Sequence, residues 1–267
     1  MTQFNQALSY DDVLVVPQYS DIESRSEVSL VSELDKSSRF ELPIIASPMD
    51  TVVEAEMALA LAGLGALGVI HRYNSIRDQR QMVWNVANAV PNKPVAAAIA
   101  ITGDFMERAE ALYNSGATIL CVDVAHGHHI MMKDALKRLR RDLPDDVHIM
   151  AGNVATRKGY EDLADWGAHS VRVGIGGGSI CSTRVQTGHG VPTFQSVLDC
   201  SESEYAGTIP IIADGGIKTS GDIVKSLGAG ADFVMIGSMF SGTTETPGKI
   251  LQGADGSKMK EYRGMAS

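Results

Sequence analysis

Eight short runs rich in Val and Ile recur along this 267-residue chain, and each leads through a polar or Gly-containing loop toward a helix-like stretch. The runs are PIIASPMDTV from Pro43, ALGVIHR from Ala66, VAAAIAI from Val95, TILCVDVAHG from Thr118, HIMAGNVAT from His148, SVRVGIGGG from Ser170, IPIIADGG from Ile209 and DFVMIGS from Asp232. Continuous apolar runs are typical of parallel strands that helices cover on both faces. Eight βα units favour a closed (β/α)₈ TIM barrel over an open flavodoxin-like or Rossmann sheet, which usually has fewer strands.

The intervening segments contain five good helix candidates, several of which begin after Ser, Thr or Asp and end at Gly. These candidates start near Glu54, Asp104, Met131, Gly159 and Ser220. After the eighth strand, the segment ETPGKILQGADGSKMKEYRGMAS shows no amphipathic helix pattern. We therefore expect one barrel domain over residues 1–267, with residues 1–42 as an N-terminal extension and with the last helix missing from this chain or replaced.

The composition limits the classes of partner. The formal net charge of -9 argues against a nucleic-acid-binding surface, so an anionic ligand would need local hydrogen-bond donors. The three cysteines show no CxxC spacing, which fits a reduced compartment better than a disulfide framework or a zinc site. We find no targeting segment and no apolar stretch long enough to cross a membrane, and we expect a cytoplasmic protein.

The loop after the sixth strand is the most informative segment, because catalytic groups of such barrels lie where the strands end. It reads GIGGGSICST from Gly174 to Thr183. Its glycines allow left-handed backbone conformations and expose amide donors to an anion. Cys181 is a candidate nucleophile and Thr183 a candidate proton shuttle. A flexible turn with an incidental cysteine is the alternative.

The seventh and eighth strands end in further glycines. Asp214 precedes Gly215 and Gly216, and Gly237 precedes Ser238. The loops after these strands form the usual phosphate site of the barrel, and a carboxylate beside them accepts hydrogen bonds from ribose hydroxyls. A nucleotide fits both features, although the glycines could instead serve only tight turns.

Polar side chains also follow three other strands. Asp123, His126, His128 and His129 lie after the fourth strand and raise a metal hypothesis, but their spacing matches no helical ligand pair, so we favour hydrogen bonding to a ligand. Further rim candidates, each of which could be a purely structural residue, are Met49, Asp50, His71 and Arg72.

Nine stretches together resemble the IMP dehydrogenase and GMP reductase family over nearly the whole chain. They are LSYDDVLVVP, SPMDTV, GVIHRY, DVAHGH, AGNVAT, VGIGGGSICSTR, ADGGI, GSMFSGTTETPG and EYRGMAS. The resemblance implies a nucleophilic Cys181, a proton relay through Thr183 and a purine nucleoside monophosphate as substrate. It implies nucleotide binding by Ser47, Met49, Gly176, Gly177, Ser179, Asp214, Gly215, Gly216, Gly237, Ser238, Tyr262, Gly264 and Met265.

The resemblance also implies a nicotinamide cofactor that faces Asp123, Asn153 and Arg172, and a K⁺ site at the carbonyls of Gly176, Gly178 and Cys181. Family members are typically homotetramers, so we expect an oligomer.

The resemblance leaves the direction of the reaction open. In dehydrogenases a pair of CBS domains commonly follows the second barrel unit, whereas residues 74–94 here hold about one helix and a connector. That difference favours a GMP reductase that uses NADPH. SRSEV, HRY and DVA are also closer to reductases, whereas ERAEAL, GTTETPG and YRGM are closer to dehydrogenases, which use NAD. An IMP dehydrogenase, an inactive nucleotide-binding barrel and an altered purine substrate such as a deoxynucleotide are the alternatives.

Overall fold

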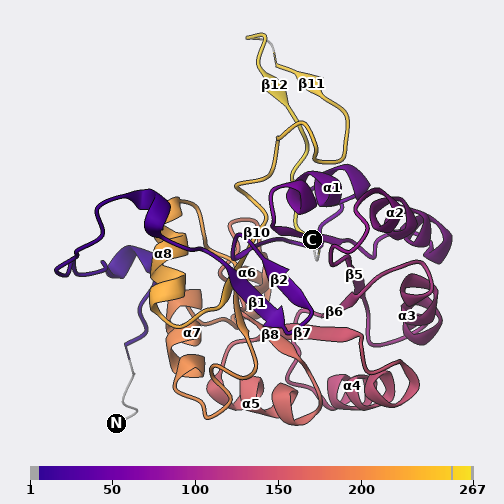
Figure 1. Ribbon diagram of the computed structural model, residues 1–267, viewed down its shortest axis with the longest axis horizontal. Helices are drawn as coiled ribbons and strands as arrows, with labels where there is room; N and C mark the ends of the chain where they lie inside the picture. The colour runs from indigo at the N-terminus through magenta and orange to yellow at the C-terminus, as the bar shows by residue number, and fades with distance from the viewer. Residues whose placement is uncertain (1–5, 254, 266–267) are drawn as a thin grey trace.

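A ring of eight parallel strands forms the centre of the computed structural model, which describes residues 6–253 and 255–265 (Figure 1). The strands are β3 (Ile44–Ala46), β4 (Leu67–Ile70), β5 (Ala96–Ile99), β6 (Ile119–Asp123), β7 (His148–Val154), β8 (Ser170–Val173), β9 (Ile211–Asp214) and β10 (Phe233–Ile236). The ring closes where β10 pairs with β3, with Val234 opposite Ile44. All eight predicted strands are present, so the TIM barrel prediction is confirmed.

Helices surround the ring in the order expected of βα units. They are α1 (Ala55–Gly63), α2 (Ile76–Ala89), α3 (Phe105–Tyr113), α4 (Ile130–Asp142), α5 (Arg157–Asp165), α6 (Thr183–Thr187), α7 (Thr193–Ser201) and α8 (Ser220–Gly228). Local capping explains several starts: the side chain of Ser75 accepts a hydrogen bond from the backbone of Asp78, and that of Thr156 accepts one from Gly159. The sequence predicted the helices starting near Glu54, Asp104, Met131, Gly159 and Ser220 and one helix within residues 74–94, but neither α6 nor α7.

After β10 the described residues form a two-stranded hairpin instead of a helix. Its strands, β11 (Leu251–Gln252) and β12 (Lys258–Met259), stand away from the barrel in Figure 1. The prediction that no helix follows the eighth strand is thus confirmed for the described part of the chain. None of the helices in that part is long and apolar enough to cross a membrane.

A hairpin near the N-terminus closes the bottom of the barrel, at the end opposite the loops that follow the strands. Short 3₁₀ turns at Tyr10–Asp12 and Arg25–Glu27 precede an antiparallel hairpin, β1 (Ser32–Asp35) and β2 (Ser38–Phe40). The hairpin inserts Leu34 and Phe40 into the apolar cluster inside the ring, where Phe40 packs edge-on against Phe233 at 5.7 Å. Part of the predicted extension therefore belongs to the core.

A polar contact holds this hairpin to the barrel. His148 Nδ1 on β7 donates to Asp35 Oδ2 at 2.5 Å, and His148 Nε2 lies 2.8 Å from Ser170 Oγ on β8. The histidine side chain is only 1% exposed. The hydrogen bond from His148 lowers the pKa of Asp35 well below its usual value, so the carboxylate is ionised in the folded protein.

Replacement of this carboxylate tests its contribution to stability. Asp35→Ala should lower the free energy of unfolding by about 1–3 kcal/mol at neutral pH, because it leaves buried His148 without its acceptor. Urea denaturation measures the change. A depressed pKa stabilises the fold above the unfolded-state pKa of about 4, so the difference from wild type should shrink as the pH falls below that value.

A matched surface control separates this effect from the loss of any carboxylate. Asp145 is 94% exposed and lies 3.7 Å from Arg140, so Asp145→Ala should change the unfolding free energy by less than about 1 kcal/mol. Equal losses in the two variants would contradict the role assigned to the Asp35–His148 contact.

Candidate active site

A cavity of about 520 Å³ opens where the barrel strands end, and it collects all but one of the site residues expected from the resemblance. The predicted residues that line it are Ser47, Met49, Asp123, Asn153, Arg172, Gly176, Gly178, Ser179, Cys181, Thr183, Asp214, Gly215, Gly216, Gly237, Ser238, Tyr262, Gly264 and Met265. Gly177 is the exception: it faces a second cavity of about 440 Å³ behind the loop. The predicted groups therefore share one space.

The loop from β8 to α6 presents Cys181 and Thr183 to this cavity. Gly174 has φ +146°, and a Cβ atom there would lie 2.0 Å from the carbonyl oxygen of Asp214, so only glycine lets the two strand ends approach so closely. The backbone N–H of Cys181 donates to the carbonyl of Gly178 at 3.2 Å and tightens the turn. Both candidate catalytic side chains thus lie on a segment that is packed against β9.

The three cysteines differ in accessibility. Cys181 is half-buried, whereas Cys121 and Cys200 are fully buried. Burial raises the pKa of Cys121 to about 11 and that of Cys200 to about 12, so these two remain thiols at neutral pH. A thiolate is the nucleophilic form of cysteine, and only Cys181 combines access to the cavity with a position on the glycine loop.

The opposite wall brings together residues that are far apart in the sequence. A Cβ atom on Gly237 would lie 2.9 Å from the Tyr262 hydroxyl and 3.1 Å from Met49 Sδ, so the ends of both side chains lie directly against the end of β10. Burial raises the pKa of Tyr262, and its hydrogen bond with Ser179 partly offsets this rise. An ion pair between Arg263 and Asp50 holds the segment around Tyr262 to the loop after β3.

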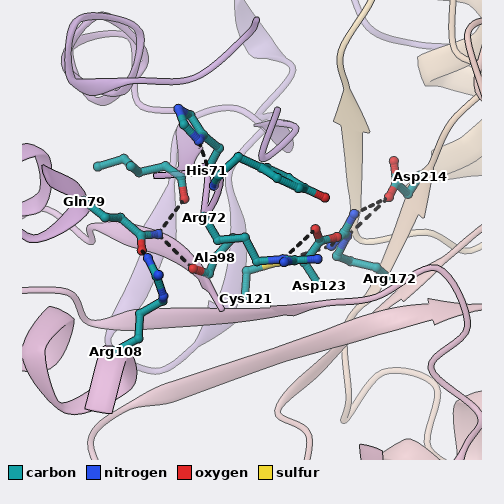
Figure 2. A network of polar contacts seen from close by, with 11 residues as sticks. His71, Arg72, Gln79, Ala98, Arg108, Cys121, Asp123, Arg172 and Asp214 are labelled. Atoms are coloured by element: carbon teal, nitrogen blue, oxygen red, sulfur yellow. Dashed lines mark hydrogen bonds and ion pairs between the residues drawn. The ribbon is translucent and has the colours of Figure 1, made fainter. Parts of the chain in front are cut away.

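A charged group lies across the mouth between β6, β8 and β9 (Figure 2). Arg172 donates to Asp123 Oδ1 at 2.7 Å and to Asp214 Oδ2 at 2.8 Å. Asn153 Nδ2 donates to the same Asp214 oxygen at 2.8 Å and to the carbonyl of Gly174 at 2.8 Å. The two carboxylates that the sequence assigned to different ligands are therefore tied to one guanidinium.

Two of the three histidines after β6, His128 and His129, have structural hydrogen-bond partners. His128 pairs with Asp162 at 2.7 Å, and His129 Nδ1 accepts a hydrogen bond from the backbone of Met131 at the start of α4. In the described residues no group of three or more His, Cys, Asp or Glu side chains could hold a metal ion. The metal hypothesis for this loop therefore has no ligand set.

Two lining residues after β4 were outside the predicted site. Arg72 was named only as a rim candidate, and Tyr73 was missed; the guanidinium carbon of Arg72 lies 4.8 Å from the Tyr73 ring centroid. Their position directly after a barrel strand was the sequence feature that could have identified them as cavity-lining residues. His71 is 2% exposed and instead supports the turn, because its Nδ1 accepts from the Tyr73 backbone.

Comparisons with known proteins agree on one family. The family described as the IMP dehydrogenase / GMP reductase domain matches residues 7–267. The inosine-5'-monophosphate dehydrogenase of Nitrosopumilus maritimus (strain SCM1) is 32% identical, and the match covers 99% of this chain and 81% of that protein. The GMP reductase of Vibrio parahaemolyticus is 37% identical, with 97% of this chain and 76% of that protein covered.

A solved structure agrees with these relatives. The crystal structure of inosine 5'-monophosphate dehydrogenase from Legionella pneumophila superposes with a TM-score of 0.89 at 46% identity, covering 98% of this chain and 78% of that one. The family match spans nearly the whole chain, and the site residues expected from the resemblance share one cavity. The chain therefore belongs to the IMP dehydrogenase/GMP reductase family and is a nicotinamide-dependent oxidoreductase of purine nucleotides.

Proposed function

We propose that this enzyme reduces GMP to IMP and ammonia at the expense of NADPH, with Cys181 as the covalent nucleophile. The observation that carries the proposal is the position of the accessible Cys181 on a glycine loop that lines the same cavity as Thr183 and Asp214. Between β4 and β5 the chain forms the single helix α2, as expected of the reductase type.

The nucleotide lies across the loops after β8, β9 and β10. The backbone of Gly215, Gly216, Gly237 and Ser238 supplies amide donors for the phosphate, and Asp214 accepts hydrogen bonds from the ribose. Ser47, Met49 and Tyr262 form the wall beside the base together with Gly264 and Met265. This arrangement leaves the purine edge within reach of the Cys181 loop.

The chemistry divides one difficult displacement into two easier steps. The Cys181 thiolate attacks C2 of the purine, and the C2–N bond breaks with proton transfer through Thr183, which releases ammonia and leaves a thioimidate. Hydride addition at C2 then breaks the C–S bond and frees IMP. The balanced reaction is GMP + NADPH + 2 H⁺ → IMP + NADP⁺ + NH₄⁺. Bound near Asp123, the cofactor supplies the hydride.

We also propose a K⁺ site at the carbonyl oxygens of Gly176, Gly178 and Cys181. The Gly178 carbonyl accepts the Cys181 N–H, whereas the carbonyls of Gly176 and Cys181 accept no hydrogen bond from the described residues. Backbone carbonyls are the ligands that K⁺ prefers in proteins. These three oxygens would hold the ion against the loop and limit the motion of the nucleophile.

We further propose that the protein is a homotetramer and that it lies in the cytoplasm. Light scattering on the purified protein measures the molar mass of the particle and so tests the tetramer.

The second candidate is an IMP dehydrogenase, which the Legionella structure favours through its 46% identity. In that case IMP + NAD⁺ + H₂O → XMP + NADH + H⁺ proceeds through the same Cys181 adduct. The two reactions use different nucleotides and opposite hydride directions, so a direct assay distinguishes them.

One prediction of the proposed function concerns the reaction itself. Purified enzyme should oxidise NADPH in the presence of GMP, seen as a falling absorbance of the reduced nicotinamide, and should not reduce NAD in the presence of IMP. Activity only in the second pair would assign the dehydrogenase. Inactivity in both pairs, with nucleotide binding retained, would leave an inactive nucleotide-binding barrel.

Another prediction of the proposed function concerns the nucleophile. Cys181→Ala should lower kcat by at least about 10³-fold, because no other thiol in the cavity can form the adduct. A 2-chloropurine nucleoside monophosphate, which loses chloride when a thiolate attacks C2, should label the wild type at Cys181 by peptide mass spectrometry. Cys200→Ala, at a buried position on α7, is the matched control and should retain activity. Label on Cys121 or Cys200 would remove the assignment.

A further inference from the structure

Arg172 is the most enclosed charged side chain of the cavity wall. It projects from β8 and is 5% exposed. Its Nη1 donates to Asp123 Oδ1 at 2.7 Å and to Cys121 Sγ at 3.3 Å, while Nη2 and Nε both donate to Asp214 Oδ2 at 2.8 and 3.2 Å. All three nitrogens thus have acceptors inside the protein, and these bonds fix the orientation of the guanidinium.

Asp123 and Asp214 each have one carboxylate oxygen that is not hydrogen-bonded to Arg172. Asp214 Oδ2 accepts from Arg172 and Asn153, whereas Oδ1 has no hydrogen-bond partner among the described residues. Asp123 gives Oδ1 to Arg172, and its Oδ2 lies 3.7 Å from Arg72 Nε. Both acids line the cavity, and Arg172 holds one oxygen of each.

The charges balance only if Arg172 is present. Burial alone would lower its pKa, but the neighbouring Cys121, Asp214 and Asp123 raise the pKa well above the usual value, so the guanidinium stays charged. Arg72, Asp123, Arg172 and Asp214 form a row of alternating charge across the mouth in Figure 2. Loss of Arg172 would leave two acids side by side in a poorly solvated wall, where they repel each other.

We propose that Arg172 is a positioning residue that fixes both the nucleotide-binding Asp214 and the cofactor-facing Asp123. This inference rests on the proposed function, because that function assigns the two acids to different ligands. It adds this positioning role to the expectation that Arg172 faces the cofactor. One side chain therefore sets the geometry of both halves of the site.

The test compares Arg172→Ala and Arg172→Lys with two controls. Arg172→Ala should raise KM for the nucleotide and for the cofactor by roughly tenfold or more each, because both acids lose a charged hydrogen bond. Arg172→Lys keeps the charge without the planar fork and should recover only part of the loss. Millimolar guanidinium should restore both KM values in Arg172→Ala, because the vacated space adjoins the open cavity. Asp123→Asn should raise KM for the cofactor alone.

Arg108→Ala is the matched structural control. Arg108 is also a buried arginine, 8% exposed, and it donates to Gln79 and Asp104 outside the cavity. Its loss should lower the melting temperature without changing either KM in the folded enzyme.

Three results would overturn the inference in an active wild type. These are unchanged KM values in Arg172→Ala, a rise confined to the cofactor KM, and no rescue by guanidinium. Nucleotide titration by calorimetry keeps the proposed function separate: a wild type that binds neither GMP nor IMP would refute that function itself, and this inference with it.

Discussion

The closure of the parallel ring brings the functional groups of this protein together. The β10–β3 pairing turns a row of strands into a barrel, so the carboxyl ends of strands far apart in sequence meet around one opening. Cys181 follows β8, Asp214 ends β9 and Gly237 follows β10, and all three reach the same cavity. An open sheet would place the ends of β3 and β10 at opposite edges, and no single ligand could contact both.

Close approach of the backbone is the second constraint, and glycine meets it at specific places. At Gly174 a side chain would collide with the Asp214 carbonyl, and at Gly237 it would displace the end of the Tyr262 side chain. The residues that shape these turns thus bring the Cys181 loop and the wall that contains Met49 and Tyr262 into one cavity. This explains why glycines at the strand ends indicate function here as well as turn geometry.

The sequence predicted the strands well because a barrel strand is apolar on both faces, and that pattern is local. It predicted the lining of the cavity because residues just after a strand must lie at the mouth. The β1–β2 hairpin was not recognised as part of the core, because Leu34 meets its partners only in three dimensions. Likewise, the sequence around Gly177 does not distinguish it from the neighbouring glycines, although Gly177 faces the second cavity behind the loop. The hydrogen bonds from Arg172 to Asp123 and Asp214 could not be predicted either, because these residues are far apart in the sequence.

Net charge sets a further requirement. With a formal charge of -9, the protein repels a nucleotide at long range, so the attraction must come from within the cavity. Two arginines in the wall, Arg72 and Arg172, are already balanced by Asp123 and Asp214. In the proposed function, that leaves the phosphate to backbone amides of the glycine turns, whose partial charges carry no titrating group. Side-chain charge would then hold the acids in place while the backbone binds the anion.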